Sequence, residues 1–232
     1  MSNSTNSSST GSGSTGSGST GSGDAPAARS KHKRKAGEAT AALPIEDRVI
    51  EAALALIAVN GWSRVTLADI AAAAGLSLVE LHDQFPGKGA VLTAYSRRTD
   101  VRVLRAVDPE DQEGEKPKDR LFEVLMLRFD EIGQHKEAVR QLARDLRDPF
   151  DLLSGVKPAL RSMHWMLEAA GIDSGGLLGA ARARALAVIW LAAFRVWLSD
   201  GEGLAKTMAE MDRRLEQASF LWGRDEGTSA RH

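Results

Sequence analysis

Residues 45–92 read IEDRVIEAALALIAVNGWSRVTLADIAAAAGLSLVELHDQFPGKGAVL, and this stretch decides the fold. Its first part, residues 45–60, repeats apolar residues every three or four positions, which is the period of an amphipathic helix. Asn60-Gly61 then ends the helix, because glycine readily takes the left-handed conformation that closes helices. The stretch therefore opens with a single amphipathic helix.

Two shorter helices follow, and each has its own start signal. Thr66 is followed by Asp69 three residues later, and Ser77 is followed by Glu80 at the same distance. Both pairs fit the capping box, in which two side chains satisfy the backbone at a helix start. Gly75 supplies the turn between the helices. A helix, a turn of about three residues and a second helix form a helix-turn-helix, whose second helix enters the DNA major groove.

The stretch resembles the DNA-binding domain of the TetR family of bacterial regulators. The resemblance is carried, at the family's spacing, by Ala52, Ala53, Leu54, Gly61, Thr66, Asp69, Ile70, Ala71, Ala74, Gly75, Ser77, Leu81, Phe85, Lys88 and Leu92. It implies a transcriptional repressor whose binding to a double-stranded DNA operator is modulated by a small ligand. By the same resemblance, the residues expected to contact DNA are Thr66, Ser77, Leu78, Val79, His82, Gln84 and Lys88.

The charge of this stretch departs from what DNA binding favours. The expected recognition helix, residues 77–84, contains no Lys or Arg and carries Glu80 and Asp83. Over residues 45–92, three basic residues stand against six acidic ones, a net charge of −3. Because neutralisation of phosphates normally drives much of DNA affinity, this balance keeps open an alternative in which the fold is retained and DNA binding is lost.

A basic segment lies just upstream, where residues 29–35 read RSKHKRK. Lys33, Arg34 and Lys35 are expected to contact DNA, since a basic arm before the first helix can reach the minor groove or the phosphates. The alternative is a solvated charge run that only keeps a tail soluble.

Composition divides the rest of the chain. The first 23 residues are almost wholly Ser, Thr, Asn and Gly, so residues 1–44 are expected to be a disordered tail that ends in the basic arm. The helix-turn-helix domain follows at 45–92, a larger ligand-binding and dimerisation domain at 93–222, and a second disordered tail at 223–232. The chain has no Cys and no apolar signal segment, which favours a cytoplasmic protein.

The larger domain lacks alternating strand patterns, so an all-α fold of about nine helices is expected, the number typical of the TetR fold. Its helices are expected at about 87–106, 119–133, 135–146, 158–171, 177–198 and 204–221. The helix at 158 is placed there because Pro158 suits a first helical turn.

The helix expected at 177–198 contains ten consecutive apolar residues, 185–194. This run is too short for a membrane span, which needs about 20 residues, and a helix that is apolar all round is buried on all sides. TetR proteins dimerise through their last two long helices, so a homodimer is expected here. The interface residues expected are Leu186, Ile189, Ala193, Trp197, Met208 and Leu215.

The family resemblance also implies a ligand pocket in the larger domain. Methionine and aromatic side chains line adaptable sites, and no polar cluster marks a particular ligand, so an apolar or amphipathic small molecule or lipid is expected. The candidates are Met126, Phe129, Met163, Trp165, Met166, Trp190 and Phe194. For each of them, plain helical core is the competing interpretation.

Residues 182–218 also resemble the end of the coenzyme Q biosynthesis accessory proteins. The resemblance is carried by Trp197, Leu198, Asp200, Thr207, Met208, Ala209 and Leu215. It implies a TetR-fold protein that binds lipids or isoprenoid quinones and does not read DNA, which is the alternative function.

Catalysis is not expected. The five His residues show no metal-ligand spacing, and the chain has neither a phosphate-binding loop nor a nucleophile elbow. No cofactor and no metal are therefore expected.

Overall fold

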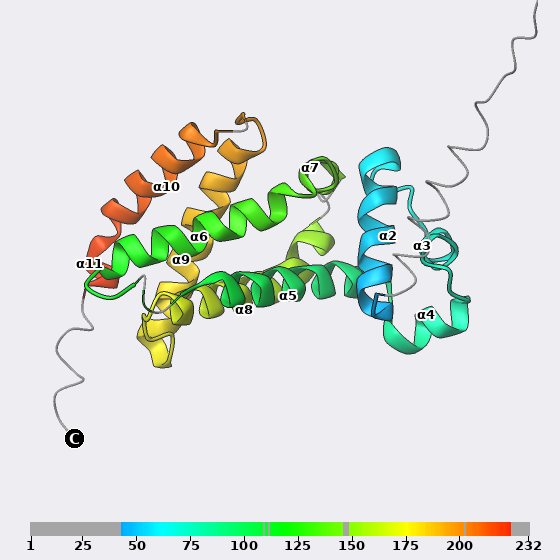
Figure 1. The fold of residues 1–232 in the computed structure, drawn as a ribbon, viewed down its shortest axis with the longest axis horizontal. Coiled ribbons are helices and arrows are strands. Elements are labelled where there is room, and N and C mark those ends of the chain that lie inside the picture. The colour runs from blue at the N-terminus through cyan, green and yellow to red at the C-terminus, as the bar shows by residue number, and fades with distance from the viewer. Residues whose placement is uncertain (1–42, 109, 111, 146–148, 202, 224–232) are drawn as a thin grey trace, which may run out of the picture. The chain divides into compact units, whose positions relative to one another are not determined.

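The structure, a computed structural model, describes residues 43–108, 110, 112–145, 149–201 and 203–223, and for residues 149–156 it describes the backbone alone. Within these ranges all regular elements are helices, which confirms the all-α fold (Figure 1). The ten described helices are α2 (Ile45–Asn60), α3 (Leu67–Ala74), α4 (Leu78–Gln84), α5 (Lys88–Ala106), α6 (Pro117–Gly133), α7 (Lys136–Asp145), α8 (Pro149–Ala169), α9 (Gly176–Trp197), α10 (Ala205–Gln217) and α11 (Ser219–Trp222).

Helices α2, α3 and α4 form a small three-helix unit. The apolar face of α2 contributes Ile50, Leu54 and Ile57 to its core, and α3 contributes Ile70. Gly61, with φ 77°, ends α2 as the sequence predicts, and α2 has the expected bounds. This unit therefore forms around side chains whose helical period is visible in the sequence.

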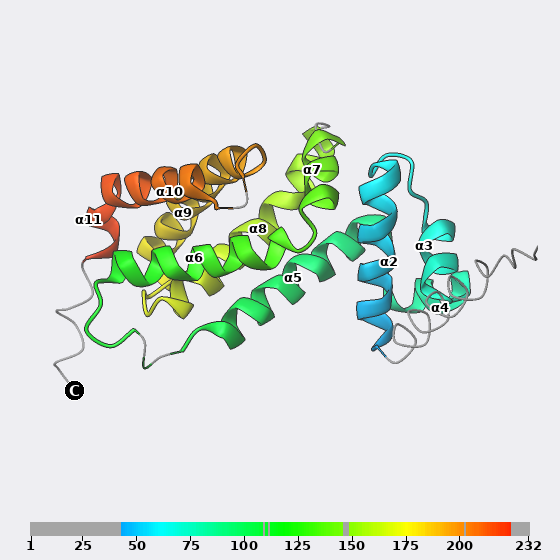
Figure 2. The same cartoon turned by 45° about the horizontal axis from the view of Figure 1, so that its top comes forward.

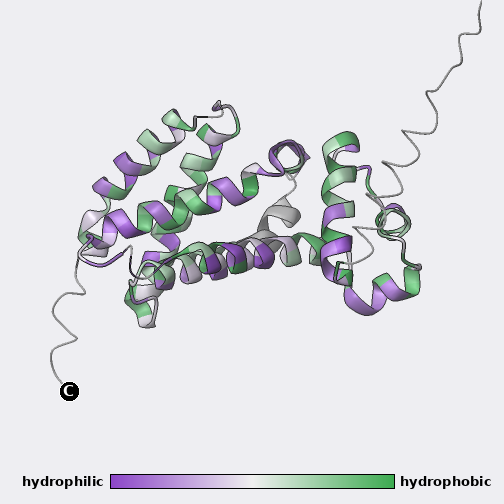
Figure 3. Cartoon of the chain, in the orientation of Figure 1, coloured by the Kyte–Doolittle hydropathy of each residue, from purple (hydrophilic) through white to green (hydrophobic). Residues whose placement is uncertain are grey.

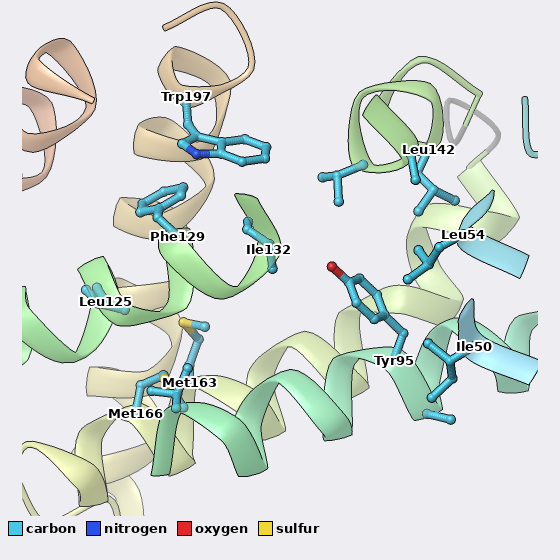
Figure 4. Packing of buried hydrophobic residues seen from close by; sticks show 14 of the residues in the cluster. Ile50, Leu54, Tyr95, Leu125, Phe129, Ile132, Leu142, Met163, Met166 and Trp197 are labelled. Atoms are coloured by element: carbon cyan, nitrogen blue, oxygen red, sulfur yellow. The ribbon is translucent and has the colours of Figure 1, made fainter. Parts of the chain in front are cut away.

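Helix α5 connects the three-helix unit to the larger bundle, and it packs against α2, α6 and α8 (Figure 2). The domain boundary expected at 92–93 falls inside this helix. Figure 4 shows Tyr95 of α5 between Ile50 and Leu54 of α2 on one side and Ile132 of α6 on the other. The buried core is continuous here, and the region from residue 43 onward forms one compact unit.

Aromatic side chains fill the centre of the larger bundle. Phe129 of α6 stacks on Trp190 of α9 with ring centroids 4.1 Å apart, and it lies 5.8 Å from the ring of Trp197. Met163 and Met166 of α8 are buried close by (Figure 4). These contacts hold α6, α8 and α9 together through large side chains in close contact.

Two sequence expectations about helix bounds are wrong. Pro158 does not begin a helix but lies inside α8, which starts at Pro149. A proline inside a helix loses one backbone hydrogen bond and is disfavoured, although a helix can tolerate it with a kink. The last expected helix divides at Ala218, whose backbone leaves the helical region, into α10 and α11. The described residues therefore form ten helices where about nine were expected.

Helix α9 is long and apolar enough to cross a membrane by length and composition alone. The core helix of a soluble protein can have the same length and composition. One face of α9 packs against α8 and α10, and its Arg182 is buried and donates to the carbonyl oxygens of Leu221 and Asp173. These contacts are those of a helix that packs inside a protein.

Candidate DNA-reading site

Both short helices of the three-helix unit begin with a complete capping box. The Thr66 hydroxyl accepts from the Asp69 backbone N–H at 3.1 Å, and the Asp69 carboxylate accepts from the Thr66 N–H at 2.9 Å. At α4, Ser77 and Glu80 make the same pair at 3.2 and 2.7 Å. The hydrogen bonds from Thr66 lower the pKa of Asp69, and those from Ser77 lower the pKa of Glu80. Both carboxylates therefore belong to helix starts, as the sequence predicts.

The turn between α3 and α4 is fixed from both sides. Gly75 takes the left-handed conformation (φ 67°, ψ 40°), and the following N–H of Leu76 donates to the carbonyl oxygen of Ala71 at 2.9 Å. Arg48 reaches across from α2 and donates through Nε to the carbonyl oxygen of Ala74 at 3.1 Å. A cation at a helix C-terminus also favours the helix dipole. The sequence gives no signal for this role of Arg48.

Helix α4 is anchored on one side and open on the other. Leu81 and the following residue Phe85 are buried in the core, whereas Leu78 and Val79 are 55% and 70% exposed. His82, Asp83 and Gln84 are exposed as well. The structure thus leaves the expected contact residues of α4 exposed to solvent, with Ser77 at the start of the helix.

Lys88 has a partner inside the protein. Its ammonium donates to the carbonyl oxygen of Trp62 and lies 4.0 Å from the centre of the Trp62 ring. This contact ties the start of α5 to the loop between α2 and α3. The assignment of Lys88 to DNA by resemblance stays a prediction, and any phosphate contact would have to compete with the Trp62 carbonyl.

Three acidic residues of α2 are paired with α5. Arg97 donates to Glu46 at 2.7 Å, and Arg98 makes ion pairs with Asp47 at 3.2 Å and Glu51 at 2.7 Å. The net charge of −3 was counted over residues 45–92, and Arg97 and Arg98 lie just beyond that range. The negative charge of α2 is therefore compensated at the α2–α5 junction. Glu80 and Asp83 are the acidic residues that remain on α4.

A further contact joins the three-helix unit to α7. The Asp145 carboxylate accepts from the Ser63 backbone N–H at 3.0 Å and from the Ser63 hydroxyl at 3.2 Å. The hydrogen bond from the Ser63 backbone lowers the pKa of Asp145 most. This link joins α7 to the loop that leads into α3. No spacing in the sequence predicts it.

Comparisons with known proteins agree with this geometry. Residues 49–95 match the family model described as bacterial regulatory proteins, tetR family. A solved TetR transcriptional regulator from Nitrosomonas europaea ATCC 19718 is 25% identical, with a TM-score of 0.62, and the match covers 77% of this chain and 99% of that one.

The chain has the TetR fold. A TetR transcriptional regulator from Rhodococcus sp. RHA1 is 18% identical with a TM-score of 0.55, and the match covers 75% of this chain and 94% of that one. The fatty acid degradation regulator FadR from Bacillus halodurans is 17% identical with a TM-score of 0.50 over 79% and 97% of the two chains. These two likenesses concern the fold. No curated protein sequence matches the chain.

The basic arm with Lys33, Arg34 and Lys35 lies outside the described residues, as do residues 1–42 of the tail expected at 1–44 and residues 224–232 of the tail expected at 223–232. Their assignments stay predictions.

The residues expected to line a ligand pocket in the TetR fold have different surroundings. Phe129, Met163 and Met166 are fully or almost fully buried in the core, whereas Trp165 is 50% exposed. Trp190 and Phe194 are partly buried and stack with their neighbours. Met126 lines a pocket of about 300 Å³ together with Ala106, Asp108, Gln112, Glu123, Val124, Leu127 and Asp130. Among the seven candidates, Met126 is therefore the residue that lines this pocket.

The six residues expected at a dimer interface lie mainly inside the chain's own core. Leu186, Ile189, Ala193, Trp197 and Leu215 are buried, and Met208 of α10 is 41% exposed. The other face of α9 carries exposed aliphatic residues, among them Leu177, Val188 and Leu191 at 93%, 64% and 47%. An interface on α9 and α10 therefore has to use that face, with Met208.

Proposed function

We propose that the chain is a cytoplasmic transcriptional repressor of the TetR type, which binds a DNA operator as a homodimer and whose operator binding is modulated by an apolar or amphipathic ligand. The observation that carries the proposal is the turn at residues 75–77, which joins α3 to α4, where each helix begins with a capping box and α4 leaves one face exposed. In a helix-turn-helix, this is the arrangement by which the second helix reads base edges.

The charge of α4 shapes how DNA would be bound. Helix α4 has no Lys or Arg, and the Lys88 ammonium donates to the carbonyl oxygen of Trp62. Phosphate contacts would therefore come from the exposed Arg64, from the backbone and hydroxyl groups near Thr66 and Ser77, and from the basic arm. Each lysine or arginine that contacts a phosphate adds about one unit to the dependence of log affinity on log salt. Replacement of Lys33, Arg34 and Lys35 by alanine should therefore reduce that slope by about three and weaken binding to all sequences alike. An unchanged slope would show that the arm is only a soluble tail.

The homodimer would form through the exposed face of α9 together with α10. Leu177, Val188 and Leu191 lie on this face and Met208 on α10, and large aliphatic side chains that gather on one surface mark an interaction site. A two-fold dimer places two copies of α4 about one DNA turn, or about 34 Å, apart. A ligand shifts this spacing only if it binds the two arrangements unequally. Asp145 and the α2–α5 ion pairs are the contacts through which the larger domain would act on the three-helix unit.

The alternative is a lipid or isoprenoid-quinone carrier on the same fold, which is favoured by the lack of Lys and Arg on α4. Three of the residues that suggested it have structural roles, however. Trp197 is buried in the core, and Asp200 accepts from the N–H and hydroxyl of Thr207 at 2.8 and 2.9 Å, which fixes the start of α10. Those residues are therefore accounted for without a lipid.

A salt-titrated binding assay separates the two functions. The full chain is mixed with the DNA upstream of its own gene and with a scrambled fragment of the same length and composition. A complex specific to the upstream DNA that weakens with salt supports the regulator. If no specific complex forms at low salt and extraction of the purified protein yields lipid or quinone, the carrier function replaces it.

A further inference from the structure

The exposed face of α4 begins with two aliphatic side chains. Leu78 and Val79, the first two residues of the helix, are 55% and 70% exposed, while the helix buries Leu81. Figure 3 shows this start of α4 in green and the following turns in purple. Leu78 and Val79 are mostly exposed, so the packing of this chain gives little reason for aliphatic residues there.

The carboxylate of the neighbouring residue Glu80 is already hydrogen-bonded within the helix start. The Glu80 carboxylate accepts from the Ser77 N–H at 2.7 Å and from the Ser77 hydroxyl at 2.8 Å, which directs it back toward the helix start. The next exposed side chains, His82, Asp83 and Gln84, lie further along the helix. The first turn of α4 therefore offers mainly aliphatic surface to whatever it meets.

Only one base presents an aliphatic group in the major groove. Thymine carries a C5 methyl there, whereas the other base edges present hydrogen-bond donors and acceptors. The N-terminal residues of the second helix are those that contact base edges. We infer that Leu78 and Val79 determine operator specificity by packing against thymine methyl groups in each half-site. This inference rests on the proposed DNA-binding function and adds the base that the helix reads.

The test begins with selection of binding sites by the full chain from random double-stranded DNA. The selected thymines are then replaced one at a time by deoxyuridine, which removes only the methyl group. Burial of one such group is worth about a fourfold change in affinity, or about 15-fold when both half-sites are changed together. Leu78→Ala/Val79→Ala should be insensitive to the replacement. Val101→Ala, which shortens an exposed aliphatic side chain on α5, should respond as the unchanged chain does.

The outcomes separate this inference from the proposed function. Selection of thymine, with loss of affinity on deoxyuridine in the unchanged chain but not in the double variant, supports it. The inference is overturned if the selected site lacks thymine, or if removal of the methyl group leaves the affinity unchanged. The proposed function as a DNA-binding regulator would stand in either case. Failure to select any site overturns both. Both substituted side chains are exposed, and the folding of the double variant is checked by its helical circular dichroism and melting temperature.

Discussion

At the scale of single residues, Asp145 of α7 joins the larger bundle to the three-helix unit. It holds Ser63 by two hydrogen bonds, and these keep its pKa below the ordinary aspartate value of 3.8. A carboxylate with a lowered folded-state pKa stabilises the fold above its unfolded pKa and loses that effect as the pH falls through the folded value. The link is therefore present at neutral pH and disappears in acid.

Asp145→Asn should lower the melting temperature at neutral pH, because the amide accepts the Ser63 hydrogen bonds without a charge. The difference from the unchanged chain should shrink as the pH falls below about 4 and vanish when both chains carry a neutral group. Melting curves across this pH range measure it. Asp130→Asn, which alters an exposed carboxylate on α6, is the control and should show a much smaller difference. A deficit of Asp145→Asn that stays constant with pH would contradict the role of its charge.

The other informative group of residues is buried between α5, α6 and α8. Arg128 pairs with Asp100, whose second oxygen accepts from the Ser162 hydroxyl at 2.7 Å, and all three residues are buried. Arg128 also lies 5.4 Å from the centre of the Trp190 ring. A buried pair of this kind is costly to break from one side, because the remaining charge has no counterion.

Asp100→Leu should therefore lower the free energy of unfolding by about 3–5 kcal/mol, as for other buried pairs that lose one partner. Asp100→Leu/Arg128→Met removes both charges and should recover most of this loss. Urea unfolding of the three proteins gives the comparison. If the double variant is as unstable as the single one, the cost comes from packing and not from the isolated charge.

At the scale of elements, the α3–turn–α4 segment depends on the left-handed glycine between its helices. A Cβ at Gly75 would strain a φ of +67° and meet Nη2 of Arg48 at 3.3 Å. Gly89, in the first turn of α5, has nothing within 4 Å of a Cβ and no positive φ. The two positions thus respond in opposite directions to the same substitution.

Gly75→Ala should destabilise the chain by about 1–2 kcal/mol, the cost of a left-handed backbone for an L-residue. Gly89→Ala should stabilise it by up to about 1 kcal/mol, since alanine loses less entropy in a helix. Denaturant unfolding measures both, and DNA affinity should fall for Gly75→Ala alone. Equal effects of the two substitutions would mean that the turn is not held as described.

The sequence predicted the elements whose signals are local, and it failed where the signal is not local. Thr66, Ser77 and Gly75 mark caps and a turn within a few residues, so α2, α3 and α4 were placed correctly. In α9, ten consecutive apolar residues hide the helical period, so the sequence could not show that the face with Leu186 and Ala193 points into the core. The roles of Arg48 and Asp145 depend on residues far away in the chain, and no local pattern reveals them.

At the scale of the whole molecule, the exposed face of α9 should set the oligomeric state. Val188→Glu/Leu191→Glu places two charges on this face and should convert a dimer into a monomer, because unpaired charges in an apolar interface are costly. Sedimentation velocity measures the change. Val101→Glu, on α5, is the control and should stay dimeric. If the double variant still dimerises, the interface lies elsewhere. If the unchanged chain is a monomer, there is no such interface.

The central claim is that α4 carries sequence specificity, and the ratio of Kd values for scrambled and selected DNA at the same physiological salt tests it most directly. For the unchanged full chain the ratio should be about 10³ or more, as in specific DNA-binding proteins. For Leu78→Ala/Val79→Ala/His82→Ala/Gln84→Ala, which alters four exposed side chains of α4, the ratio should fall sharply while binding to scrambled DNA stays the same. A ratio near one for the unchanged chain would contradict the claim, and so would an undiminished ratio for the fourfold variant.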